Sequence, residues 1–94
     1  MEDDANHWKE GAITVAWLVY ILCCGDGTLY TGITVDVEAR LAAHRRGKGA
    51  RYTRGRGPLQ LVYLRRARDY SDALGWEADI KRLSRAAKLD LISS

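Results

Sequence analysis

The chain has 94 residues, enough for one compact domain with a single core. Hydrophobic residues make up 47% and charged residues 29%, which excludes a disordered or fibrous protein. The longest apolar run, residues 15–24, is too short to cross a bilayer, and the first residues are acidic, unlike a secretory signal. We therefore expect a cytoplasmic protein with no membrane partner.

Charge is divided unevenly along the chain. Residues 1–16 carry one Lys and four acidic residues, and we predict an acidic, flexible leader there, followed by a single domain over residues 17–92. From Arg40 to Arg68 there are ten Lys or Arg residues and no acidic residue. Cations without compensating anions repel one another, so this stretch favours a polyanionic partner, nucleic acid above all, over a merely solvated basic face.

The first predicted elements form a β-hairpin. Residues 17–24 are apolar and rich in β-formers, which is typical of a buried strand. Gly25-Asp26-Gly27 predicts a turn, and the alternating residues 28–34 predict the returning strand.

The rest of the chain predicts three helices and a third strand. Asp36 begins a helix that ends near Gly47, because Asp favours helix starts and Gly favours helix ends. Residues 47–58 contain four glycines and predict a loop without regular structure. The later elements are a strand over 59–66, a helix capped by Ser71 that runs through Leu83, and a helix capped by Ser84 that runs through Ile92. The order ββαβαα indicates an α+β domain with a small three-stranded antiparallel sheet flanked by helices.

The register of the hairpin decides whether its two tyrosines, Tyr20 and Tyr30, lie on the same face of the sheet or on opposite faces. A three-residue turn places Tyr20 opposite Gly32, with Tyr30 as its diagonal neighbour on the same face. Gly32 then leaves space in which the Tyr20 hydroxyl can reach a ligand. A two-residue turn sends the tyrosines to opposite faces. Both registers stay open at this point, as does a purely structural role in the core.

Polar residues interrupt the apolar faces of the two main helices. In the first helix, Arg40 and His44 share a stripe with Val37 and Leu41 that should be apolar if it only packs on the sheet. Arg can bury its stem and His can bond a backbone carbonyl, so packing is one explanation and a polar site is the other. Glu77 lies at the edge of the next apolar stripe, where it suits either a salt bridge or a Mg²⁺ ion that takes few protein ligands.

The glycine-rich stretch over residues 47–58, the arginine-rich loop, carries regularly spaced cations. Lys48, Arg51, Arg54 and Arg56 recur every two or three residues, and Tyr52 lies among them. Such spacing suits a phosphate backbone, and an aromatic ring offers a surface on which an unpaired base can stack. We predict that this loop binds nucleic acid; a basic loop kept for solubility is the alternative.

These residues together resemble the motifs of the GIY-YIG nuclease superfamily. Leu18-Val19-Tyr20 and Tyr30-Thr31-Gly32 are similar to its paired name-giving motifs, and Arg40, His44 and Glu77 follow in matching order. The chain looks like the short stand-alone branch, related to the structure-specific nuclease subunit of resolvases. It departs from the pattern at Leu18-Val19 and Thr31, and we expect it to work without the separate DNA-recognition region that other members of the family usually carry.

The resemblance implies phosphodiester hydrolysis at one divalent ion, Mg²⁺ or Mn²⁺. Glu77 would bind the metal, Arg40 would neutralise charge on the phosphoryl group, and His44 would orient the attacking water or relay a proton. Tyr20 would position or deprotonate that water with Tyr30 beside it, and which tyrosine is the base stays open.

The resulting prediction is a metal-dependent endonuclease acting on DNA rather than RNA, with structured or branched DNA as its substrate. A protein partner would supply substrate specificity. The alternative is a nucleic-acid-binding module of the same fold without catalysis. A protein-interaction adaptor using the acidic leader and Trp8 is a third reading that nothing specific favours.

Overall fold

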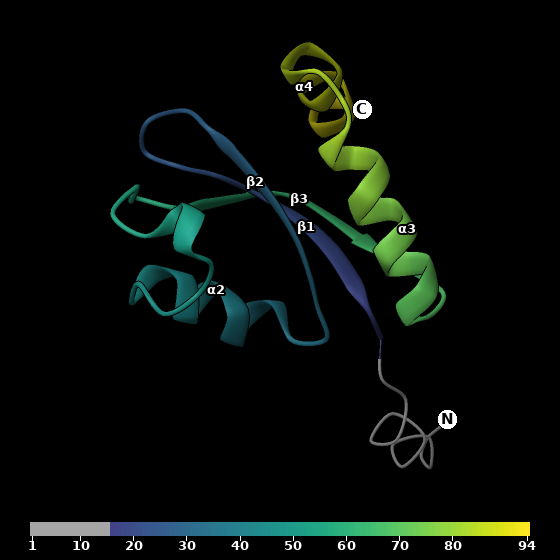
Figure 1. Cartoon of the computed structure of the whole chain (residues 1–94), viewed down its shortest axis with the longest axis horizontal. Coiled ribbons are helices and arrows are strands. Elements are labelled where there is room, and N and C mark those ends of the chain that lie inside the picture. The colour runs from purple at the N-terminus through teal and green to yellow at the C-terminus, as the bar shows by residue number, and fades with distance from the viewer. Residues whose placement is uncertain (1–15) are drawn as a thin grey trace.

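The computed structural model describes residues 16–94 (Figure 1). The acidic leader expected over residues 1–16, with Trp8, lies outside the described residues except for Ala16. Within residues 16–94, no helix has the length and apolar character needed to cross a membrane.

The predicted ββαβαα order and α+β class are confirmed. One short 3₁₀ turn, η1, interrupts the arginine-rich loop, for which no regular structure was expected. The elements are β1 (Leu18–Cys23), β2 (Leu29–Thr34), α2 (Val37–Arg45), η1 (Arg51–Thr53), β3 (Gln60–Arg66), α3 (Tyr70–Lys81) and α4 (Arg85–Ser93).

The sheet is antiparallel, with β1 in the centre and β2 and β3 at its two edges. The register of β1 with β2 pairs Tyr20 with Gly32, as the three-residue turn predicts. Because side chains alternate along a strand, this register places Tyr20 and Tyr30 on the same face.

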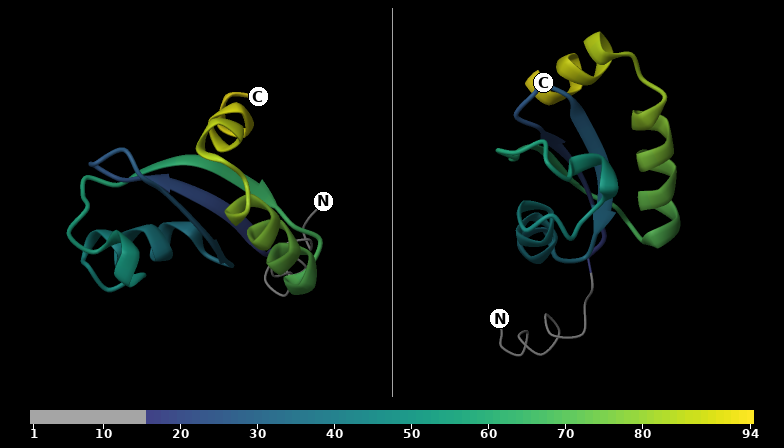
Figure 2. Two further views of the ribbon diagram at one scale, coloured as in Figure 1. Left: turned by 45° about the horizontal axis from the view of Figure 1, so that its top comes forward. Right: turned by 60° about the vertical axis from the view of Figure 1, so that its left-hand side comes forward.

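Helices cover the two faces of the sheet (Figure 2). The sheet therefore separates the core into two clusters, one on each face. On the α3 face, Val19 and Ile21 pack with Ala73 and Ile80. On the α2 face, Tyr20 and its neighbours on the sheet pack against Val37 and Leu41. The α2 face is therefore the one on which a polar site can form around Tyr20.

Helix ends follow the expected chemistry with one exception. Asp36 accepts from Ala39 N at 3.1 Å, and Ser84 accepts from Ala87 N at 3.1 Å, as predicted. The prediction that Ser71 caps α3 is wrong: Asp69, which precedes the first helical residue, accepts from Asp72 N at 2.8 Å. The helix also ends at Lys81 rather than Leu83.

Candidate active site

A buried chain of polar side chains lies on the α2 face. The Tyr20 hydroxyl lies 2.9 Å from His44 Nε2, and His44 Nδ1 lies 2.7 Å from Thr53 Oγ1. Thr53 in turn donates to the carbonyl of Ala50 at 3.0 Å. Each of the three linked side chains is about 2% exposed. The arginine-rich loop and α2 are therefore joined to the central strand β1 by hydrogen bonds as well as by apolar contacts.

Two neutral tautomers of His44 satisfy these contacts. When the Thr53 hydroxyl donates to Ala50 O, Thr53 Oγ1 accepts from His44 Nδ1–H, and Nε2 accepts from the Tyr20 hydroxyl. When the Ala50 N–H donates to Nδ1 at 3.4 Å, Nε2–H instead donates to the Tyr20 oxygen. The longer Ala50 contact is the weaker of the two contacts at Nδ1. A hydroxyl, rather than the backbone carbonyl expected for a purely structural histidine, therefore satisfies Nδ1.

Two glycines make room for these rings. A Cβ on Gly32 would lie 2.5 Å from the Tyr20 hydroxyl oxygen, and a Cβ on Gly49 would overlap His44 Nδ1. The space predicted beside Gly32 exists, but the tyrosine itself fills it. The expectation that this space leaves the Tyr20 hydroxyl open to a ligand is therefore wrong for the free protein.

Aromatic rings connect the buried chain to the surface. The Tyr30 ring lies 6.3 Å from that of Tyr20 and 5.2 Å from that of His44. On its other side Tyr30 stacks on Tyr52 at 5.9 Å, and Tyr52 is 43% exposed. We call Tyr20, Tyr30, His44 and Thr53 the Tyr20 cluster; through Tyr52 it reaches the arginine-rich loop.

The neutral forms of Tyr20 and His44 are favoured by their surroundings. Burial raises the pKa of Tyr20 above its ordinary value, the Tyr30 phenol and the Glu77 carboxylate raise it further, and Arg40 opposes them. Burial, together with the positive charge of Arg40, lowers the pKa of His44. In the tautomer with Nδ1–H, neutral His44 can therefore receive a proton from Tyr20, and Tyr20 does not ionise by itself.

Arg40 and Glu77 lie beside the Tyr20 cluster without bonding to it. Both influence the Tyr20 pKa through their charges, but among the described residues neither donates to nor accepts from a member of the cluster. Arg40 is exposed on α2, so of the two polar positions in its stripe only His44 is buried. The Glu77 carboxylate pairs with Lys81 Nζ at 3.3 Å and its side chain is 20% exposed.

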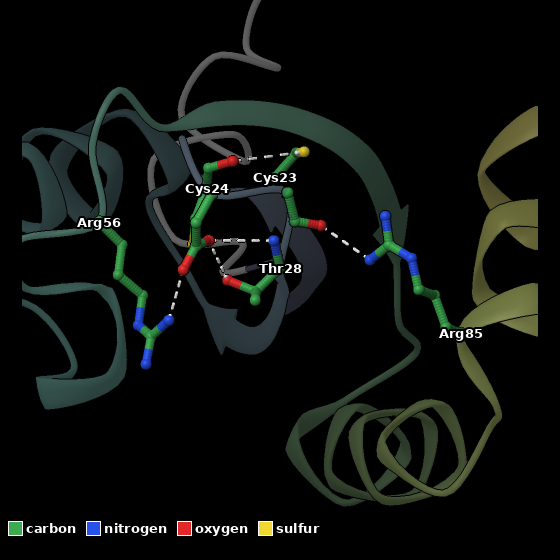
Figure 3. A network of polar contacts seen from close by, with 7 residues as sticks. Cys23, Cys24, Thr28, Arg56 and Arg85 are labelled. Atoms are coloured by element: carbon green, nitrogen blue, oxygen red, sulfur yellow. Dashed lines mark hydrogen bonds and ion pairs between the residues drawn. The ribbon is translucent and has the colours of Figure 1, made fainter.

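The cations of the arginine-rich loop fall into two groups. Arg54 Nε donates to Gly47 O at 3.2 Å. Arg56, labelled in Figure 3, pairs with Asp26 at 2.6 Å. The Arg56 guanidinium also covers the Tyr52 ring. Hydrogen bonds from Thr28, aided by Arg56, lower the pKa of Asp26 to about 2. Lys48 and Arg51 are exposed, and neither forms an ion pair within the part of the chain that the structure describes. These two are the cations most available to phosphate.

A divalent ion would find a single protein carboxylate here. Among residues 16–94 no three His, Cys, Asp or Glu side chains gather as a metal-binding group. Mg²⁺ commonly takes one or two carboxylates and fills its other positions with water and phosphate oxygens. The accessible oxygen donors of Glu77 fit such an ion, provided that Lys81 releases them.

Three residues of the site were missed by sequence reasoning. Thr53 forms a hydrogen bond with His44, Gly49 leaves room for the His44 ring, and Lys81 forms an ion pair with Glu77. A signal for Thr53 existed, since a buried histidine needs partners on both nitrogens and Thr53 is the one hydroxyl side chain besides tyrosine in residues 47–58.

Comparison with known proteins places this geometry in a family. Residues 16–90 match the family model of the GIY-YIG catalytic domain. The chain belongs to the GIY-YIG family. Its membership implies an endonuclease-type function and a nucleic-acid substrate.

Relatives of this GIY-YIG domain are similar along most of their length. A UPF0213 protein of Halalkalibacterium halodurans is 51% identical over 75 residues, 80% of each chain. The solution NMR structure of a UPF0213 protein from Bacillus halodurans is 49% identical, with a TM-score of 0.55 and 83% of each chain covered. That of a protein from E. faecalis is 33% identical, with a TM-score of 0.61 and 85% coverage of each. The match to small stand-alone proteins agrees with the predicted branch.

Proposed function

We propose that this protein is a divalent-metal-dependent endonuclease that hydrolyses phosphodiester bonds in DNA, with structured or branched DNA as its substrate. The observation that carries the proposal is the Tyr20–His44–Thr53 hydrogen-bond chain beside Arg40 and Glu77. It supplies a neutral proton acceptor, a cation and a carboxylate in a family with endonuclease-type function.

The Tyr20 cluster activates the attacking water. The half-buried Tyr30 orients the water beside Tyr20. Substrate binding admits a water to the Tyr20 oxygen, which is buried in the free protein. As the water proton passes to that oxygen, the phenol proton passes to His44 Nε2 in the tautomer with Nδ1–H, and the hydroxide formed attacks phosphorus while the P–O bond to the leaving oxygen breaks. Thr53 accepts from Nδ1 throughout and keeps the ring oriented. This route avoids a free phenolate, which the raised pKa of Tyr20 disfavours.

Charged residues stabilise the reacting phosphate. The exposed guanidinium of Arg40 faces negative charge that builds on the phosphoryl oxygens. Glu77 would hold the metal ion once its carboxylate has released Lys81. When bound, Mg²⁺ or Mn²⁺ polarises the phosphate and stabilises the leaving oxygen.

Features outside the Tyr20 cluster support DNA with unpaired regions as the substrate. Lys48 and Arg51 are free to contact phosphates, and the Tyr52 ring offers a stacking surface once Arg56, which covers it, moves away. A cytoplasmic location and a partner protein that supplies specificity stay predictions from sequence.

Cleavage assays test this proposal directly. Linear, flapped and branched DNAs and RNAs are incubated with the full chain in Mg²⁺, Mn²⁺ or EDTA. Glu77→Gln should abolish cleavage and leave affinity within a few-fold, because it removes the charge that holds the ion while keeping the side chain's shape. Asp79→Asn, a matched change at an exposed position of the same helix, should cleave normally. Undiminished cleavage by Glu77→Gln would refute the metal role. Binding that is indifferent to metal, with no cleavage, would favour the non-catalytic module.

A further inference from the structure

A groove follows the free edge of β2, on the far side of Tyr30 and Tyr52 from the buried chain. Two adjoining hollows of about 320 and 190 Å³ share Leu29, Tyr52 and Lys88. We call it the β2–α4 groove. Its lining residues are Leu29, Tyr30, Tyr52, Lys81, Arg85 and Lys88.

The floor of the groove presents backbone hydrogen-bonding groups. β2 is an edge strand, and Cys24 N donates to Thr28 O at 2.8 Å at the start of its ladder with β1. Bonded and non-bonded pairs alternate in an antiparallel ladder, so the N–H and C=O groups of Leu29 and Thr31 point away from β1. An edge of this kind offers donors and acceptors to an extended chain.

An unsatisfied hydroxyl borders the same groove. Thr31 is 3% exposed, and its Oγ1 is the one buried side-chain polar atom that lacks a hydrogen-bond partner among the described residues. Thr31 also lines the larger hollow. Buried polar groups are almost always paired, so Thr31 Oγ1 is an exception among the described side chains, and it lies at the border of the groove.

The wall opposite the tyrosines is basic. Lys81, Arg85 and Lys88 come from the end of α3 and from α4, and Lys88 makes no ion pair in residues 16–94. Arg85 donates to Gly27 O at 2.7 Å, which ties α4 to the hairpin turn. Figure 3 shows Arg85 and Arg56 on opposite sides of this turn. Of the nearby acidic groups, Asp26 pairs with Arg56 outside the groove, whereas Glu77 pairs with Lys81 of the basic wall.

We propose that the β2–α4 groove binds an unpaired strand of the nucleic-acid substrate. Lys81 and Lys88 contact its phosphates, and the outward amides of β2 bond to the strand. One base stacks on Tyr52 in place of the Arg56 guanidinium that covers this ring in the free chain. A peptide added to the β2 edge is the competing occupant, but strand addition gains specificity from side-chain pockets, whereas this groove offers lysines and an aromatic ring. The inference rests on the proposed function for the identity of the polymer.

Binding without cleavage tests the groove separately from catalysis. In EDTA, anisotropy of a labelled oligothymidine of about ten nucleotides reports single-strand affinity, and a labelled hairpin reports duplex affinity. Lys88→Glu should weaken single-strand binding about tenfold and duplex binding less than about threefold, because it reverses a charge in the groove. Arg66→Glu makes the same change at an exposed position of β3, the opposite edge, and should cost less than about threefold for both.

Amide NMR shifts locate the bound strand. Oligothymidine should move the Leu29 and Thr31 amides, and the Thr31→Val variant should bind it more weakly while duplex affinity is unchanged. Unmoved amides, or equal weakening by Lys88→Glu and Arg66→Glu, would overturn the groove as the binding site. If Lys88→Glu does not fold, Lys88→Gln replaces it, with a smaller loss of the same selectivity.

The two proposals can fail independently. Groove binding in EDTA without cleavage of any substrate in Mg²⁺ or Mn²⁺ would reject the proposed nuclease activity and leave the groove standing. Normal cleavage combined with wild-type single-strand binding by Lys88→Glu would reject the groove and leave the activity standing.

Discussion

The Tyr20 cluster and the arginine-rich loop meet at Tyr52, yet they are stabilised in different ways. In the cluster, side chains such as Tyr20 and His44 are buried, neutral and joined by hydrogen bonds. In the loop, Lys48 and Arg51 are exposed and charged, and polar contacts of their neighbours fix the backbone. Changes in the cluster should therefore alter stability and chemistry together, whereas changes at exposed cations should alter rate or affinity with little effect on folding.

The largest effect is expected at an exposed cation beside the cluster. Arg40→Ala should slow cleavage about a hundredfold or more, as for the loss of a preorganised charge in the transition state. The midpoint of thermal unfolding should change little, because Arg40 is exposed and forms no ion pair among the described residues. Arg46→Ala, at an exposed position just after the same helix, is the control and should cleave normally. A marked loss of stability with normal activity per folded molecule would make Arg40 a packing residue.

The next effect is on folding. Gly32→Ala should lower the free energy of unfolding by about 3 kcal/mol, since its Cβ displaces Tyr20 and breaks the bond to His44. Denaturant unfolding measures this change. Gly75→Ala is a control of opposite sign: its Cβ meets only open space on a helix, so it should stabilise by about 0.5–1 kcal/mol. Equal behaviour of the two variants would show that Tyr20 relaxes without cost.

The Tyr20 cluster and the elements around it also show how much of the structure could be predicted from the sequence. The hairpin and the helices followed from alternation and turn chemistry, which are local. The opposition of Tyr20 to Gly32 was one of two registers that the sequence left open, and the structure decides between them. The pairing of Tyr20 with His44 and of His44 with Thr53 joins segments distant in sequence, so it depends on packing. Asp69 and Ser71 are both residue types that cap helices, and the local sequence does not decide between them. For this reason the cap of α3 was predicted at Ser71, whereas the structure has it at Asp69. The β2–α4 groove could not be predicted from the basic stretch Arg40 to Arg68, because its cations lie after that stretch, at the end of α3 and in α4.

A smaller effect is expected when the loop cations are removed. Replacing Arg51, Arg54 and Arg56 by Ala should weaken binding to all nucleic-acid sequences and reduce the slope of log K against log salt by about two. The structure sharpens this test, because Arg54 and Arg56 have partners within the chain. Lys48→Ala with Arg51→Ala should therefore lower the slope by more than Arg54→Ala with Arg56→Ala does. Titrations at several salt concentrations measure both slopes, and an unchanged slope in the triple variant would show that the loop is basic for solubility only.

The smallest effect concerns protonation of the buried histidine. Burial lowers the pKa of His44 in the folded chain below the value of about 6.5 that it has when unfolded. The unfolded state then binds more protons as the pH falls through that value, so stability should decrease as the pH falls from 7 toward 5. The decrease should stop once the pH falls below the folded pKa. Unfolding in urea at each pH measures it, and His44→Gln should remove this contribution while His7→Asn leaves it in place. A wild-type stability that is flat from pH 7 to pH 5 would mean that the folded chain accepts the proton without cost, and would contradict the lowered pKa of His44.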